Sequence, residues 1–126
     1  MDIIHPCISG CDYAALLQLV EDIEIWEVVN SIGALKAPRP DGIGADFYHK
    51  CWGIVKDSVS PMIKDFFLNN LSLRLINHTN IAFIPKVEFP EMVGNYWTIS
   101  LCNVSYKIIT KIITTRPRPL LDRCVS

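Results

Sequence analysis

Basic side chains beside structure-breaking residues are the positions best suited to chemistry with phosphate. Lys36 and Arg39 lie in the segment KAPRPDG, where two prolines prevent a helix or a central strand. Lys86 directly follows a short apolar segment, and Lys107 and Lys111 lie four residues apart further on. Charge-assisted hydrogen bonds to phosphate are strong. The pattern therefore indicates local basic sites that could meet a nucleotide or a nucleic-acid backbone.

The sequence gives little support for a metal site or for a hydrolase or general-base active site. His5, Cys7 and Cys11 lie close together, but no second pair of ligands at zinc-site spacing follows, so we favour side chains without a metal role. The aspartates are scattered, whereas a two-metal site gathers carboxylates around ions about 4 Å apart. No Gly-rich phosphate loop, G-x-S-x-G or H-E-x-x-H motif occurs. We interpret His49 as a solvated histidine and not as a general base.

Composition indicates a single globular domain. The chain has 126 residues, half of them hydrophobic, and a net charge of -1, so a nucleic-acid role must rest on a local patch. Five cysteines, an odd number, and a start (MDIIHP) without a signal-peptide pattern predict an intracellular protein, nuclear or cytoplasmic, with reduced thiols. No apolar run approaches the roughly 20 residues that span a membrane, so we expect no membrane partner.

Hydrophobic periodicity predicts the elements that must position these residues. The predicted helices cover residues 12–20, 22–32, 45–57, 60–70 and 104–115, with Gly33 as the C′ residue that ends the second one. We expect Asp22, Ser60 and Asn103 as N-caps, with Pro61 in a first turn. The expected apolar faces are Ile25, Val28, Val29 and Ile32, then Phe47, Cys51, Ile54 and Val55, and finally Ile108, Ile109, Ile112 and Ile113.

The strands are expected after the helix-rich half. Residues 79–85 (TNIAFIP) and 98–102 form short apolar segments separated by a polar loop. Leucines at positions 71, 73 and 75 alternate with other residues and predict a brief extended piece. Pro117 and Pro119 should stop the last helix. Helices followed by strand, strand and helix predict an α+β fold.

Three features resemble the N-terminal part of the reverse transcriptase domain of non-LTR (LINE-type) retrotransposons, which are abundant in plant genomes. EDIEIWEVVNSIGALKAPRPDGIGADFYHKCWGIV is similar to that family's helix, K-A-P-G-P-D-G loop and F-Y-x-K-x-W helix. NHTNIAFIPKVEFPEMVGNYWTISLCNVSYKIITKIITTR is similar to its strand ending I-P-K, its Y-R-P-I-S-L-C-N segment and its Y-K-I-I-x-K helix. The separation between the blocks is the third feature. The resemblance covers about residues 21–121, which leaves 1–20 as an N-terminal extension and 122–126 as a tail.

The resemblance implies a helix-rich part of the fingers and upper palm of an RNA-directed DNA polymerase, with an RNA template and DNA as partners. The nucleotide- or nucleic-acid-binding residues that it implies are Lys86, which would face the nucleotide, Lys36 and Asp41, in the loop near the template, and Lys107, Lys111 and Arg116, at basic positions of the last helix.

Three departures from the family pattern bear on function. Trp97 stands where the family has the arginine expected to meet the triphosphate, and a neutral indole cannot make that charged contact. Arg39 replaces a glycine, which would cost roughly 1 kcal/mol if the position requires a positive φ. Pro117 occupies a usual leucine position and should end the helix early.

The family's metal-binding aspartates belong to two later palm motifs, and the 126 residues contain neither. Intact members use Mg²⁺, whereas we expect no cofactor in this fragment and no nucleotidyl transfer by it alone. The leading hypothesis is a truncated, degenerate reverse transcriptase fragment, to which a palm region could be supplied in trans.

Two alternatives remain open. The first is a non-catalytic RNA- or DNA-binding module whose affinity depends on salt. Its basic patch would comprise Lys36, Arg39, Lys86, Lys107 and Lys111. The second is a chain without a stable fold of its own, because apolar surface that normally packs on a palm would be exposed.

Overall fold

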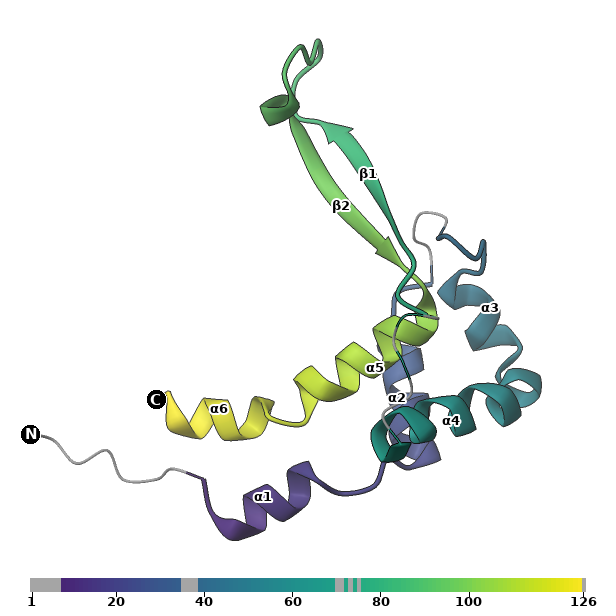
Figure 1. Cartoon of the computed structure of the whole chain (residues 1–126), viewed down its shortest axis with the longest axis vertical. Helices are drawn as coiled ribbons and strands as arrows, with labels where there is room; N and C mark the ends of the chain where they lie inside the picture. Colours follow the sequence, from purple (N-terminus) through teal and green to yellow (C-terminus); the bar gives the residue numbers. More distant parts are fainter. Residues whose placement is uncertain (1–7, 35–38, 70–71, 73, 75, 126) are drawn as a thin grey trace, which may run out of the picture.

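The computed structural model describes residues 8–34, 39–69, 72, 74 and 76–125. In chain order, the elements are α1 (Gly10–Leu16), α2 (Asp22–Ser31), α3 (Ala45–Lys50), α4 (Trp52–Asn69), β1 (Thr79–Pro85), the 3₁₀ turn η2 (Val93–Asn95), β2 (Tyr96–Cys102), α5 (Val104–Thr115) and α6 (Arg118–Cys124). The two strands pair antiparallel. The fold is α+β, as predicted, and the hairpin projects away from the helices (Figure 1).

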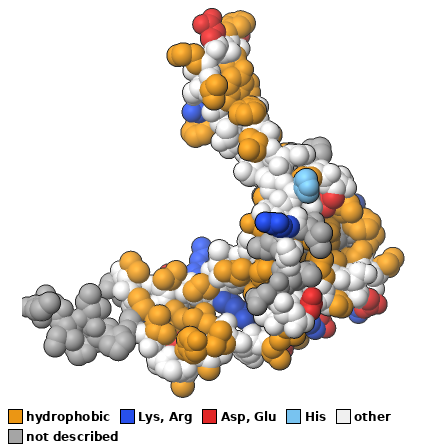
Figure 2. Space-filling model, viewed as in Figure 1, with side chains coloured by type: hydrophobic (Ala, Val, Ile, Leu, Met, Phe, Trp, Pro, Cys, Tyr) orange, Lys and Arg blue, Asp and Glu red, His pale blue; other side chains and the backbone are white. Residues whose placement is uncertain are grey.

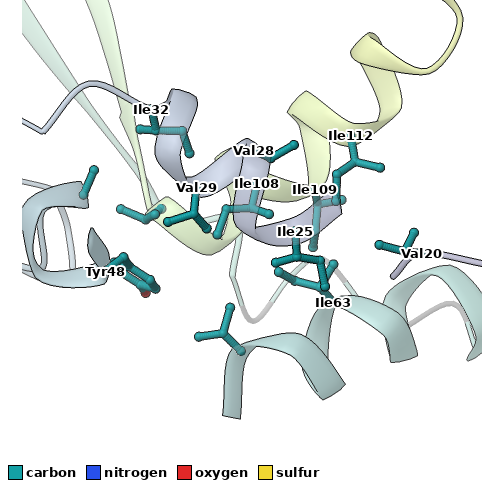
Figure 3. Close-up of a cluster of buried hydrophobic side chains, with 13 residues drawn as sticks. Val20, Ile25, Val28, Val29, Ile32, Tyr48, Ile63, Ile108, Ile109 and Ile112 are labelled. Carbon is teal, nitrogen blue, oxygen red and sulfur yellow. The ribbon is translucent and has the colours of Figure 1, made fainter. Parts of the chain in front are cut away.

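The core lies where α2, α4 and α5 meet (Figure 3). Ile25 and Val29 of α2, Ile108 and Ile112 of α5, and Ile63 of α4 are all 0% exposed. In α2 and α5 these side chains recur four residues apart, which places them on one stripe of each helix. The predicted apolar face of α2 is thus confirmed, and so is most of that of α5.

The predicted helix start at Ser60 and Pro61 is wrong. One helix, α4, runs from Trp52 to Asn69 with Pro61 inside it. A proline there costs about 3 kcal/mol because it removes a hydrogen bond and crowds the preceding turn. Val59 and Ile63 nevertheless continue one buried stripe across the proline. Burying each such side chain contributes about 1.5–3 kcal/mol, which favours a continuous helix.

The helix predicted over residues 45–57 is divided at Cys51, where α3 ends. The predicted apolar face forms only in part, because Cys51 and Val55 are partly buried and Val55 packs against the core. Phe47 and Ile54 are exposed, whereas Tyr48 is buried. His49, which we expected in solvent, is partly buried, and its Nε2 lies 2.8 Å from the carbonyl oxygen of Val29.

Several boundaries and caps differ from the predictions. Helix α1 begins at Gly10 because Ser9 forms a capping box with Asp12. The N-cap of α2 is Glu21, not Asp22, and Asn103 makes no side-chain capping bond. Strand β2 begins at Tyr96, two residues earlier than predicted. The leucines at 71, 73 and 75 lie outside the described residues.

The helix that was predicted to stop at Pro117 does so, but a further helix, α6, follows it. Helix α5 stops at Thr115, before Pro117. Pro119 lies in the first turn of α6, where its missing N–H has no intrahelical partner to lose. An ion pair of 2.8 Å between Arg123 and Asp12 joins α6 to α1. Apolar residues at the end of the sequence therefore belong to a helix and not to an irregular tail.

Candidate nucleic-acid interface

The hairpin places Lys86 far from the helical part of the molecule. The register runs from Thr79 opposite Cys102 to Pro85 opposite Tyr96, and the Lys86 N–H then donates to the Asn95 carbonyl (2.7 Å). At about 3.4 Å per residue, the paired strands put Lys86 roughly 20 Å beyond the end that joins α5. Lys86 is exposed there, so its position is compatible with the nucleotide-facing role implied by the resemblance.

Lys86 and Trp97 form a cation–π pair. The Lys86 Nζ lies 4.4 Å from the centroid of the indole ring and donates a hydrogen bond of 3.1 Å to the Gly94 carbonyl. Trp97 is 61% exposed. An ammonium within about 6 Å of a Trp ring is attracted by its negative face. The residue that departs from the family pattern is therefore the residue that orients this lysine.

The KAPRPDG segment ends in a tight turn. The Gly42 N–H donates to the Arg39 carbonyl (2.9 Å), and the Asp41 carboxylate accepts from the Ile43 N–H (3.0 Å). Gly42 has a φ of 71°, a conformation that favours glycine. The Asp41 carboxylate therefore helps to shape this turn. Lys36 lies outside the described residues.

Arg39 is buried and does not contribute to a basic surface. Only 5% of it is exposed, and its Nη1 donates to the Cys102 carbonyl at 2.8 Å. Its Nε and Nη2 have no hydrogen-bond partner among the described residues, and neither does the buried Oδ1 of Asn103. Arg39 thus fastens the turn to the base of the hairpin, which separates it from the basic patch of the binding-module hypothesis.

Lys107 and Lys111 line a shallow groove of about 300 Å³ between the end of α2 and α5. The Lys111 Nζ donates to the Ser31 carbonyl at 3.1 Å. Carbonyls at a helix C-terminus carry partial negative charge, so this lysine compensates the end of α2. The carbonyls also weaken the attraction of the groove for a phosphate. Of the basic residues implied by the resemblance, these two lie together on α5, whereas Lys86 lies beyond the Pro85–Tyr96 end of the hairpin, the end away from α5.

Arg116 lies within a network of protein contacts. Its guanidinium bonds to the Glu24 carboxylate and to the carbonyls of Leu16 and Gln18. It also lies 5.9 Å from the ring centroid of Phe67. The Glu24 hydrogen bonds raise the pKa of Arg116, and burial lowers it by less. These contacts give Arg116 a structural task, and its nucleic-acid role stays a prediction.

No known protein-family model matches the chain. No group of three or more His, Cys, Asp or Glu residues within the described ranges could hold a metal ion. Two of the three candidate zinc ligands in the sequence, His5 and Cys7, lie outside the described ranges. None of the described helices has the length and apolar character needed to cross a membrane.

Sequence reasoning missed the partners of four basic residues, Arg39, Lys86, Lys111 and Arg116. The cation–π pair links positions 86 and 97, and the Arg116 network links α5 to α2 across the chain. The local signal for the first pair was an aromatic residue near the start of one strand and a lysine directly after the end of the other. The stacked indoles of Trp26 and Trp52, 5.2 Å apart, were likewise invisible without the packing of α2 against α4.

Proposed function

We propose that the chain is a fingers and upper-palm fragment of a non-LTR retrotransposon reverse transcriptase. Alone, the fragment binds RNA or DNA and does not polymerise. What carries the proposal is the second sequence block, which folds as one continuous unit: β1, the turn at Lys86, β2 and α5. That unit presents Lys86 in solvent at the far end of the hairpin. An exposed ammonium beside an aromatic ring suits contact with a nucleic acid.

The proposed inactivity of the isolated chain rests on a motif that the 126 residues lack. Nucleotidyl transfer with two metal ions needs carboxylates that converge. The sequence contains no aromatic-x-Asp-Asp motif. Mg²⁺ belongs to the intact polymerase in this proposal, and the fragment itself holds no cofactor. Primer extension with Mg²⁺ or Mn²⁺ tests this directly, because template-dependent synthesis above a heat-inactivated control would contradict it.

The hairpin also supports a protein partner, the palm region of the same kind of polymerase. Hydrophobic side chains are exposed along both strands (Figure 2). Two-stranded hairpins are marginally stable without packing partners. A palm region supplied in trans would cover part of this surface, in the nucleus or the cytoplasm. Co-elution of the purified chain with a palm fragment in gel filtration is the expected result, and separate elution would remove this partner.

Nucleic-acid binding is tested by fluorescence anisotropy with labelled single-stranded RNA and DNA at about 50 and 200 mM salt. Affinity should fall as salt rises, because phosphate contacts release counterions. Lys86→Gln should weaken binding and reduce the salt slope by about one. Lys50→Gln is the matched control, since Lys50 is an exposed lysine in an ion pair with Asp46 on α3. Binding that ignores salt, or equal effects of the two variants, would argue against the proposal.

A further inference from the structure

One face of the hairpin is almost entirely apolar. Residues alternate between the two faces of a strand, and the register pairs Ile84 with Trp97 and Ala82 with Ile99. These four side chains form what we call the Trp97 face. Ile84, Trp97 and Ile99 are all more than 40% exposed. The opposite face carries Phe83, which packs edge-on against Tyr96.

Lys86 belongs to the Trp97 face because it follows Ile84 by two residues. Its ammonium is held by the indole and by the Gly94 carbonyl. An ammonium has three N–H donors, so one bond to Gly94 leaves others for an anion. The result is an exposed ring with a positive charge fixed at 4.4 Å from its centroid.

On the Trp97 face itself, the strand register places a cation and no carboxylate. Neither strand contains a charged residue. The carboxylates nearest in sequence, Glu88 and Glu91, belong to the loop between the strands, and no ion pair joins either to Lys86 among the described residues. A flat aromatic surface with one cation complements a ligand that contains both a π-system and a phosphate.

We propose that the Trp97 face stacks one base of a single-stranded nucleic acid while Lys86 contacts a neighbouring phosphate. This inference rests on the proposed nucleic-acid binding and specifies its ligand. An indole has no charge for a triphosphate, but every base presents a π-face to it. Trp97 thereby offers a stacking surface for a base beside the ammonium of Lys86.

The test compares two oligomers with the intact chain: a labelled dT 12-mer and an abasic 12-mer with the same phosphates. Stacking requires bases, so the abasic oligomer should bind more weakly. Trp97→Ala should weaken dT binding about tenfold and weaken abasic binding much less, through loss of the indole that holds Lys86. Trp97→Phe, which keeps a ring, should lose less. Phe83→Ala is the matched control, because Phe83 is 57% exposed on the opposite face, and it should change dT affinity by less than twofold.

The outcomes separate this inference from the proposed function. If neither oligomer binds at low salt, the proposed function and this inference are both wrong. If both oligomers bind equally and Trp97→Ala changes neither, the chain binds phosphate and the stacking site is wrong. The same holds if Trp97→Ala and Phe83→Ala weaken binding equally, since both then act through hairpin stability. Circular dichroism of each variant identifies that last case.

Discussion

Arg116 and Glu24 form a two-point ion pair between residues 92 positions apart. Arg116 Nε donates to Glu24 Oε1 at 2.8 Å, and Nη2 donates to Oε2 at 2.7 Å. The side chains are 16% and 29% exposed. The same guanidinium bonds to the carbonyls of Leu16 and Gln18. One side chain therefore fixes the end of α5 to the first turn of α2 and to the segment that follows α1.

Arg116→Ala is expected to lower the free energy of unfolding by about 2 kcal/mol. Exposed ion pairs stabilise a fold by about 0–1 kcal/mol, and breaking a buried pair costs about 3–5 kcal/mol. The partly buried Arg116–Glu24 pair should lie between these values. Arg116→Lys should recover only part of the loss, because lysine cannot make the paired bonds. Urea unfolding measures both. Lys50→Ala, which removes an exposed pair on α3, should cost less than about 0.5 kcal/mol. Equal losses for the Arg116 and Lys50 variants would mean that the network contributes little.

Long-range partners of this kind explain where sequence reasoning stopped. The period of Ile25 and Val29 predicted α2 and its buried face because periodicity is a local property. The prediction at Pro61 was wrong because local rules begin or end a helix at a proline. In the folded chain, the burial of Val59 and Ile63 favours a helix that continues through it. A helix N-cap prediction at Ser60 could not include that tertiary contribution.

The candidate site shows the same limit. Sequence placed Lys86 at the end of a strand, and the structure agrees. It could not reveal that Arg39 is buried against the Cys102 carbonyl or that Lys111 reaches the Ser31 carbonyl. Each contact joins residues more than 60 positions apart. Charge type is visible in a sequence, but whether a charge faces solvent depends on the fold.

Two isoleucines of α5 test the packing of the core. Ile109 is 1% exposed and Ile113, one turn later, is 48% exposed. Ile109→Ala should lower the free energy of unfolding by about 2–5 kcal/mol, because it removes buried contacts and leaves a cavity. Ile113→Ala in the same helix should cost about 0.5 kcal/mol or less. Thermal and urea unfolding of the two variants should therefore differ clearly, and similar midpoints would mean that α5 does not dock as described.

Two glycines should respond to alanine with opposite signs. Gly42 has a φ of 71°, so Gly42→Ala should destabilise the chain by about 1 kcal/mol through backbone strain. Gly53 lies in α4, and an added Cβ would meet nothing within 4 Å. Gly53→Ala should stabilise it by about 0.5–1 kcal/mol, because alanine loses less backbone entropy in a helix. Chemical denaturation checks both, and a shift in the same direction would contradict one of these conformations.

Two surface aspartates, Asp12 and Asp22, should make the free energy of unfolding depend on pH in the acidic range. Hydrogen bonds from the backbone and hydroxyl of Ser9 lower the pKa of Asp12, and the Lys64 hydrogen bond lowers the pKa of Asp22. A carboxylate with a lowered folded-state pKa stabilises the fold above its unfolded pKa, about 3.9, and the contribution is lost as pH falls through the folded value. The urea midpoint should therefore decrease below about pH 4.

Replacement of these carboxylates separates their effect from general acid unfolding. In Asp12→Asn and Asp22→Asn the group no longer titrates, so each variant should be less stable than the natural chain at pH 7 and lose less on acidification. Asp57→Asn serves as the control, because Asp57 is an exposed aspartate of α4. Midpoints measured from about pH 6 to pH 3 span the transition of an ordinary aspartate. Parallel pH curves for all three variants and the natural chain would show that Ser9 and Lys64 do not favour the charged carboxylates.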